Sequence, residues 1–264
     1  MRLVSRFGLL LLCLMTVVST AGLASGAGPC PAIRLTGLPL PHVARTLHDN
    51  QELTIVALGS SSTAGWHASD IAHSYPAVLQ TELEAALPAV HVAVINRGIG
   101  GQDVAEMLPR IEHDVLALAP SLVIWQVGAN GALRNMDPAE FERLVDTGVR
   151  RLLKAGVDVV LMDNQRAPSI LASPAHERID QALADVAVHD GAGLFARGRL
   201  MEQWQTAGFP YADFISTDGV HHNDRGYACV AKALAASILL GLRPEGATVQ
   251  SASARTPPVR PGKL

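Results

Sequence analysis

Three side chains in this sequence have the types and spacing needed for nucleophilic catalysis. Ser61 lies in the hydroxyl-rich run Gly59–Thr63, and Asp218 and His221 lie three residues apart near the other end of the chain. A serine hydroxyl needs a base within hydrogen-bond reach, and the imidazole of that base needs a carboxylate to fix its tautomer. The set predicts a nucleophile, Ser61, a base, His221, and an orienting carboxylate, Asp218. Taken alone, the run of serines could instead cap the next helix, because short hydroxyl side chains accept hydrogen bonds from its free backbone N–H groups.

Two further stretches could stabilise the oxyanion of an acyl-transfer reaction. Asn96–Asp103 contains three glycines, which let backbone N–H groups approach a ligand closely. Gln126–Gly131 carries the amide side chain of Asn130. We therefore predict that the oxyanion is held by backbone N–H groups at Ser61 and Gly101 and by Asn130. Each donor of this kind is typically worth about 3 kcal/mol of transition-state stabilisation.

A parallel β-sheet is the expected scaffold for these side chains, because short apolar runs alternate with helical patterns along the chain. Strands of this kind joined by helices form βαβ units, which place a parallel sheet between two layers of helices. Ligands bind at the carboxyl ends of such strands, where Ser61 and both donor stretches are expected. The predicted class is α/β, a three-layer doubly wound parallel sheet of about five strands. The predicted strands are 53–58, 89–95, 121–127, 157–162 and 193–196, and the predicted helices are 74–87, 102–118, 138–155, 174–188, 198–206 and 223–240.

The chain length and composition suit one globular domain with an N-terminal extension and a C-terminal tail. The chain has 264 residues, of which 48% are hydrophobic and 17% charged. Residues 1–27 have a basic start, an apolar run and small residues, which is typical of a cleavable signal peptide and predicts a secreted or periplasmic protein. The apolar run is short for a membrane span, so we expect no stable membrane insertion. Residues 28–51 are predicted to be an extended arm, 52–242 the α/β domain and 243–264 a flexible tail.

The net charge bears on nucleic-acid binding, and the cysteine content bears on disulfide formation. Cleavage of residues 1–27 would remove two arginines and no acid, so the formal charge would change from −3 to −5. The sequence contains no basic patch of the kind that would indicate nucleic-acid binding. In an exported protein Cys30 and Cys229 are the only possible pair, and the sequence leaves a disulfide and a buried free thiol about equally plausible.

In the order of their motifs, these stretches resemble the SGNH/GDSL hydrolase family of exported serine esterases and acylhydrolases. The run Gly59–Thr63 resembles the family's Gly-Asp-Ser motif, with Ser60 in place of Asp. The Asp-x-x-His motif is present without change at Asp218–His221. The resemblance implies a flavodoxin-like SGNH hydrolase fold, a catalytic triad with Ser61 as nucleophile, and no metal or organic cofactor.

The same resemblance covers the two donor stretches. The family's glycine block resembles Asn96–Gly101, which makes Gly101 the second oxyanion donor, or Gly98 or Gly100 if the register differs. Its Gly-x-Asn-Asp block resembles 128–131, which makes Asn130 the third donor and leaves Gly131 where Asp is usual.

The sequence predicts a serine esterase that forms an acyl-enzyme on short acyl or acetyl esters, small-molecule esters or esters on glycans. The alternatives are a catalytically silent glycan-binding or envelope scaffold protein on the same fold, and an acyltransferase. Residues that could bind substrate are Asn164 and Gln165, which follow the fourth predicted strand, and His222, for which a supporting role beside His221 is the alternative. The aromatic side chains near Ser61, which could line an acyl or alcohol pocket or belong to the core, are Trp66, His67 and Tyr75.

Overall fold

The computed structural model describes residues 29–243. The predicted signal peptide lies outside the described residues, as does the predicted tail from residue 244 onward. Between residues 29 and 243, every helix is too short or too polar to cross a bilayer.

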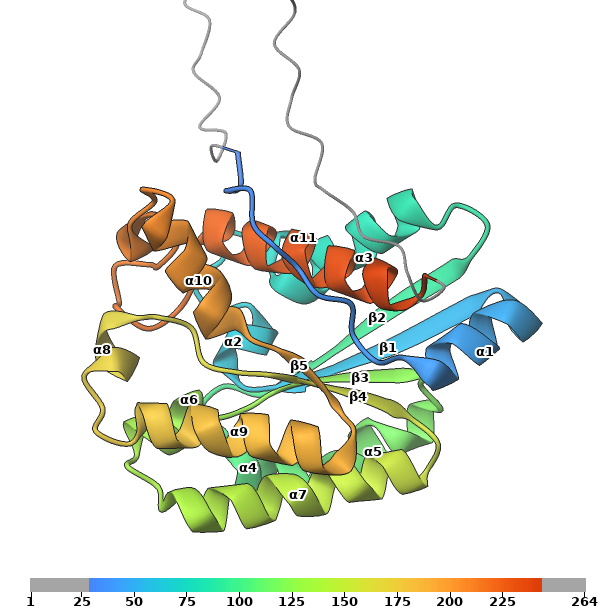
Figure 1. The fold of residues 1–264 in the computed structure, drawn as a ribbon, viewed down its shortest axis with the longest axis horizontal. Coiled ribbons are helices and arrows are strands. Elements are labelled where there is room, and N and C mark those ends of the chain that lie inside the picture. Colours follow the sequence, from blue (N-terminus) through green and yellow to red (C-terminus); the bar gives the residue numbers. More distant parts are fainter. Residues whose placement is uncertain (1–28, 244–264) are drawn as a thin grey trace, which may run out of the picture.

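Five parallel strands form one sheet in the order β2-β1-β3-β4-β5 (Figure 1). The chain starts in the interior of the sheet at β1, adds β2 on one side, and then crosses to build the other three strands on the other side. The carboxyl ends of β1 and β3 therefore flank the point where the strand order reverses, which is where open α/β sheets bind ligands. The predicted α/β class and five-strand parallel sheet are confirmed. The strands are β1 Glu52–Gly59, β2 His91–Gly98, β3 Leu122–Gln126, β4 Asp158–Met162 and β5 Gly193–Phe195.

Helices cover both faces of the sheet, so the strands are buried on both sides (Figure 1). Successive side chains of a strand point to opposite faces. On β1, Ile55 packs into one core and Val56 into the other. One face is covered by α3 Tyr75–Ala86, α10 Arg197–Thr206 and α11 Asp224–Gly241, and the other by α7 Pro138–Lys154 and α9 His176–Asp190.

The prediction of one continuous helix over residues 102–118 is wrong. The chain forms four short segments there, with the break at Pro109. Proline lacks the N–H that a helix needs and its ring clashes with the preceding turn. The segments are α4 Val104–Met107, the 3₁₀ helix Leu108–Arg110, α5 Ile111–Asp114 and the 3₁₀ helix Leu116–Leu118.

The N-terminal arm is extended only as far as Leu40, because α1 Pro41–Asn50 follows. Pro41 suits the first turn of a helix, and Asp158 Oδ2 accepts from the N–H groups of His42 and Val43 at 2.9 Å each. A carboxylate at the start of β4 thus caps a helix that the local sequence does not indicate. The short elements that were also not predicted are α2 Ser61–Ala64, α6 Ala129–Leu133, α8 Pro168–Leu171, and the 3₁₀ helices Ile71–His73 and Tyr211–Asp213.

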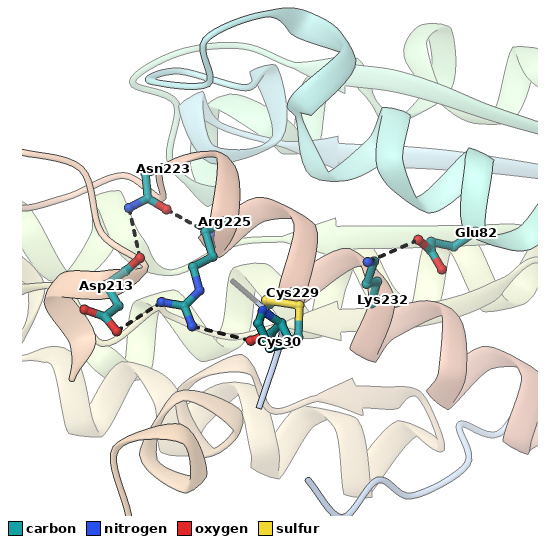
Figure 2. Close-up of a disulfide and its surroundings, with 9 residues drawn as sticks. Cys30, Glu82, Asp213, Asn223, Arg225, Cys229 and Lys232 are labelled. Carbon is teal, nitrogen blue, oxygen red and sulfur yellow. Dashed lines mark hydrogen bonds and ion pairs between the residues drawn. A yellow bond between two sulfur atoms is a disulfide. The ribbon is translucent and has the colours of Figure 1, made fainter. Parts of the chain in front are cut away.

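A disulfide joins the arm to the last helix (Figure 2). Cys30 and Cys229 are bonded, with their Cα atoms 5.4 Å apart. Of the two alternatives that the sequence left open, the disulfide is confirmed and the buried free thiol is wrong. Beside it, Arg225 on α11 pairs with Asp213 at 3.0 Å. The bond holds the start of the described chain against α11, the helix that follows the Asp218–His221 segment.

Candidate active site

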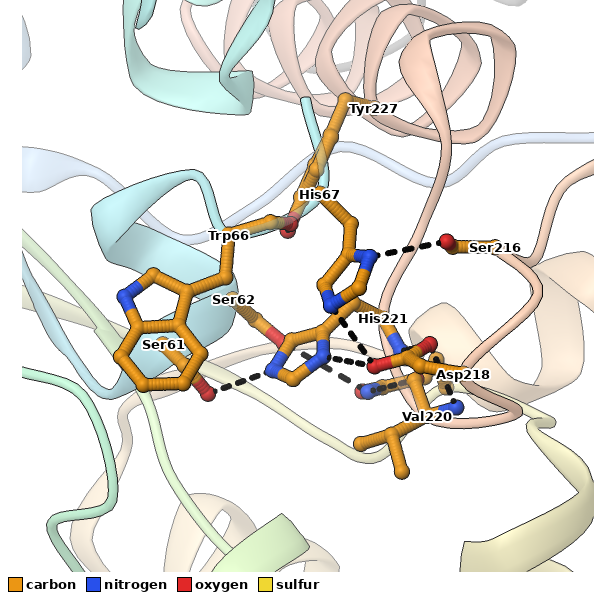
Figure 3. Close-up of polar contacts among 10 residues, drawn as sticks. Ser61, Ser62, Trp66, His67, Ser216, Asp218, Val220, His221 and Tyr227 are labelled. Carbon is orange, nitrogen blue, oxygen red and sulfur yellow. Dashed lines mark hydrogen bonds and ion pairs between the residues drawn. The ribbon is translucent and has the colours of Figure 1, made fainter. Parts of the chain in front are cut away.

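The predicted nucleophile lies on a tight turn at the carboxyl end of β1. The strand ends at Gly59, and Ser61 begins α2 two residues later. A Cβ at position 59 would lie 2.1 Å from Thr63 Oγ1, so only glycine lets the chain turn this sharply. The Ser61 side chain faces the Asp218–His221 segment (Figure 3).

One amide oxygen on the neighbouring strand holds this turn. Gln126 Oε1, at the end of β3, accepts from the N–H of Ser60 at 3.0 Å, from the Ser60 hydroxyl at 3.0 Å and from Thr63 Oγ1 at 3.2 Å. Because the Thr63 hydroxyl donates to Gln126, the contact of 3.1 Å between Thr63 Oγ1 and Tyr75 requires the Tyr75 hydroxyl to donate. Burial raises the pKa of Tyr75 to about 12, so that donor keeps its proton. Sequence reasoning placed the Gln126 stretch at the rim of the sheet but did not identify this role.

The two departures from the family motifs have local physical reasons. An Asp in place of Ser60 would face the acceptor oxygen of Gln126 with another acceptor, whereas the serine hydroxyl donates to it. At Gly131, a Cβ would lie 3.4 Å from the ring of Phe141 and 3.8 Å from the sulfur of Met136. A carboxylate would meet an apolar surface there, so glycine suits the site better than Asp.

The structure brings Ser61, His221 and Asp218 into one hydrogen-bonded line (Figure 3). Ser61 Oγ lies 2.7 Å from His221 Nε2, and His221 Nδ1 lies 2.5 Å from Asp218 Oδ2. The other carboxylate oxygen of Asp218 accepts from the N–H groups of Val220 and His221, each at 3.0 Å. Partial burial raises the pKa of Asp218, but the hydrogen bonds from His221 and from the backbone outweigh it and hold that pKa below its ordinary value. The carboxylate therefore stays charged and fixes the tautomer of His221 with the proton on Nδ1.

Buried neighbours hold the segment that carries the base. Gln165 Nε2 donates to the carbonyl of Val220 at 2.8 Å, and the N–H of Ser216 donates to the carbonyl of His221 at 2.7 Å. His222 points into the interior, with Nδ1 3.0 Å from the carbonyl oxygen of Phe214. Burial, with the Arg197 guanidinium nearby, lowers the pKa of His222 to about 3, so this ring is neutral.

The structure places the three residues predicted to bind substrate in the interior. Asn164, Gln165 and His222 have no exposed surface, so a ligand outside the protein cannot reach them in this structure. Gln165 and His222 support the Asp218–His221 segment instead. Tyr75 is likewise buried, whereas Trp66 is 53% exposed.

The predicted oxyanion donors lie on segments that pack against the nucleophile turn. Asn96 Nδ2 donates to the carbonyl of Thr63 at 2.7 Å, and Asn130 Nδ2 donates to the carbonyl of Gln102 at 2.8 Å. One N–H of the Asn130 amide therefore remains for a ligand. Gly101 has φ +81°, which favours glycine, and its carbonyl accepts from Arg134 at 2.7 Å. Among the described residues its N–H has no acceptor.

The sequence indicates that His67 could line an acyl or alcohol pocket, but it does not indicate that His67 contacts the carboxylate of the triad. His67 Nε2 lies 3.3 Å from Asp218 Oδ2, on the side away from Ser61 (Figure 3). These residues are separated by more than 150 positions, so the sequence holds no signal of the contact.

Comparisons with known proteins agree with the resemblance found in the sequence. The model of the non-GDSL lipase-like family matches residues 27–244. That description fits a chain in which Ser60 stands where a GDSL motif has Asp. No curated protein matches the sequence significantly.

Several solved structures share the fold. A two-domain esterase (CEX) active on acetylated mannans superposes with a TM-score of 0.67 at 22% identity, over 83% of this chain and 58% of that one. This chain thus spans less than two thirds of that protein. A lipase/acylhydrolase from Enterococcus faecalis superposes with a TM-score of 0.59 at 25% identity, over 74% of this chain and 100% of that one. Axe2, an acetylxylan esterase from Geobacillus stearothermophilus, superposes with a TM-score of 0.60 at 22% identity, over 70% of this chain and 94% of that one.

Replacing the acceptor under the nucleophile turn should destabilise the protein. In Gln126→Leu, three buried donors lose their acceptor, and each buried unsatisfied group costs about 1–3 kcal/mol. We expect the free energy of unfolding in urea to fall by at least about 2 kcal/mol. Gln203→Leu is the control, because Gln203 accepts one exposed hydrogen bond from Arg34 and should change stability by about 0.5 kcal/mol or less. Equal losses in the two variants would contradict this account of the turn.

Proposed function

The chain belongs to the non-GDSL lipase-like family, and on that basis we propose that it is a serine-dependent carboxylic ester hydrolase. The observation that carries the proposal is the contact of 2.7 Å between Ser61 Oγ and His221 Nε2, with Asp218 on the other ring nitrogen. A silent scaffold on the same fold would not need a serine, a base and a carboxylate in line.

The reaction proceeds in two steps through an acyl-enzyme. Ser61 Oγ attacks the ester carbonyl carbon while its proton passes to His221 Nε2, and Asp218 stabilises the imidazolium that results. Collapse of the tetrahedral intermediate breaks the bond to the alcohol oxygen, which leaves with the proton from His221. Water then gives a proton to His221 and attacks the acyl carbon, and the acid is released as Ser61 regains its proton.

The negative oxygen of each tetrahedral intermediate requires hydrogen-bond donors in fixed positions. We assign this role to the N–H groups of Ser61 and Gly101 and to Asn130 Nδ2. Two features favour the assignment: the first N–H groups of α2 have no partner within the helix, and the N–H of Gly101 has no acceptor among the described residues. Donors that are already fixed need no reorganisation when the charge develops.

An acyl group on a glycan is the substrate class that we favour. Trp66 presents an indole ring beside the triad, with its centroid 5.8 Å from that of His221 (Figure 3). The Tyr227 hydroxyl donates to the Trp66 carbonyl at 2.7 Å, and a Cβ on Gly100 would lie 2.4 Å from the indole. The ring is thus held against the donor loop while one part stays open, and an aromatic face of this kind suits a sugar ring. Two similar solved structures are esterases named for acetylated mannans and acetylxylan.

Action outside the cytoplasm is part of the proposal. The Cys30–Cys229 disulfide supports it, because such bonds persist in oxidising compartments. The signal-like composition of residues 1–27 points the same way.

Hydrolysis of simple esters tests the proposed activity. We expect the purified full chain to cleave p-nitrophenyl acetate faster than the octanoate, and Ser61→Ala to lose at least about 10³-fold in kcat. Ser62→Ala is the matched control, because its side chain makes one long contact, 3.5 Å, to Gln165. Activity that survives in Ser61→Ala would contradict the mechanism. Transfer to an added sugar in place of hydrolysis would identify an acyltransferase.

The glycan proposal predicts that Trp66 matters for polysaccharide and not for small esters. Trp66→Ala should raise KM for acetylated mannan or xylan oligosaccharides about tenfold or more, equivalent to about 1.4 kcal/mol of lost binding. The rate on p-nitrophenyl acetate should change less than about threefold, and Trp66→Phe should recover part of the loss because it keeps an aromatic face. Acetate release measured with both substrates makes the comparison, and parallel losses on both would rule out a glycan-specific role.

A further inference from the structure

One arginine joins the two segments that supply the oxyanion donors, and the reaction steps give it no role. Arg134 follows α6, four residues after Asn130, and its guanidinium reaches the loop after β2 that carries Gly101. Nη2 donates to the Gly101 carbonyl at 2.7 Å. Nη1 donates to Asp103 Oδ2 at 2.5 Å and to Glu106 Oε2 at 3.0 Å. A single side chain therefore binds the donor loop at its backbone and at the start of the helix that follows it.

The loop that carries Gly101 is a four-residue turn with two adjacent glycines at its centre. The N–H of Gln102 donates to the carbonyl of Ile99 at 3.4 Å, and Gly101, the third residue of the turn, has φ +81°. A positive φ at the third residue is characteristic of a type II turn. Because glycine adopts both signs of φ, the Gly100–Gly101 pair does not by itself select this turn over others. Contacts from outside must fix the turn, and with it the direction of the Gly101 N–H.

Other groups hold the two ends of this turn, and Arg134 holds the peptide between its last two residues. At the first residue, the N–H of Ile99 donates to the last carbonyl of β1 at 3.0 Å. At the fourth, the Gln102 carbonyl accepts from Asn130 at 2.8 Å. The bond from Arg134 to the Gly101 carbonyl orients the peptide plane that links Gly101 to Gln102. The preceding plane, which carries the Gly101 N–H, is then confined between this oriented plane and the anchored residue at the start of the turn.

A surface ion pair without a role in the site is the alternative for Arg134, because its side chain is half exposed and exposed ion pairs contribute little to stability. The partners of the guanidinium favour a positioning role. Asp103 Oδ1 accepts from the N–H of Ala105 at 3.0 Å, and Glu106 Oε2 accepts from the N–H of Asp103 at 2.9 Å. Both carboxylates are thus fixed as the capping box of α4. They hold the guanidinium in one place, from which it also binds the neutral Gly101 carbonyl.

We propose that Arg134 is a positioning residue of the oxyanion hole, which fixes the turn around Gly101 so that the Gly101 N–H points to the developing negative oxygen. It acts through Gly101 and not by contact with the substrate. Arginine suits this task because its planar guanidinium donates from several nitrogens in fixed directions, so one side chain binds a carbonyl and two carboxylates. The part of this inference that concerns rate rests on the proposed esterase function, whereas the order of the turn does not.

Backbone NMR of the full chain tests the proposal without relying on activity. Arg134→Met keeps an unbranched side chain of similar length and removes every donor. We expect the ¹⁵N order parameter of the Gly101 amide to fall from about 0.85, typical of rigid backbone, to below about 0.6. The urea concentration at the midpoint of unfolding should stay nearly unchanged, because the lost contacts are half exposed.

Kinetics on an ester that the protein cleaves tests the effect on rate. In Arg134→Met, kcat should fall at least about tenfold and KM should change less than about threefold, because the oxyanion contact is made only in the transition state. Arg134→Lys keeps a positive charge beside the two carboxylates but loses the planar set of donors. We expect its kcat to fall nearly as far as that of Arg134→Met, which separates the geometry of the guanidinium from its charge.

The control is Arg151→Met, because Arg151 is similarly exposed and bonds one carboxylate, that of Glu112 on α5 at 2.6 Å. It should leave both kcat and the Gly101 amide unchanged. If the wild-type protein cleaves esters, an unchanged kcat or an unchanged Gly101 amide in Arg134→Met would overturn the proposal, as would full activity in Arg134→Lys. If the wild-type protein cleaves no ester, the esterase function is refuted and the Gly101 amide alone decides: a mobile amide in Arg134→Met would sustain the positioning role, and a rigid one would refute it.

Discussion

The position of the nucleophile depends on one buried acceptor, Gln126 Oε1. Three donors from the turn after β1 converge on this oxygen at the end of β3, so the turn cannot shift without leaving buried donors unsatisfied. Because β1 and β3 pair in register from Ile55 to Leu58, the sheet itself sets where Ser61 stands. The site is thus fixed by the pairing of two strands at the point where the strand order reverses, and not by the turn sequence alone.

The base reaches Ser61 from a segment 160 positions away and is held by separate contacts. Gln165, after β4, holds the carbonyl of Val220, and the buried ring of His222 holds the end of the segment on the Phe214 carbonyl. The loop then continues into α11, which packs against α3 and is joined to the arm by the disulfide. Residues beyond the triad therefore act mainly by limiting movement of the two halves that meet at Ser61 and His221, which is what a preorganised site requires.

Much of the fold was predictable because its signals are local. Apolar runs of strand length alternating with helical patterns gave the parallel sheet, and hydroxyl, glycine and amide residues at strand ends gave the expected site. Contacts between distant segments left no such signal. The three donors to Gln126, the pairing of His67 with Asp218 and the burial of Asn164 and His222 all depend on tertiary packing. The break in the helix over 102–118 differs, because Pro109 signals it locally, although the apolar periodicity alone predicts one continuous helix.

Covalent labelling of the nucleophile tests the central claim most directly. A fluorophosphonate reacts with a serine only where a base activates it, and the adduct is stable enough for peptide mapping by mass spectrometry. The account predicts one adduct per chain, on Ser61, and loss of labelling in folded His221→Ala. Failure of the folded protein to label, or an adduct on Ser60 or Ser62 in place of Ser61, would contradict it.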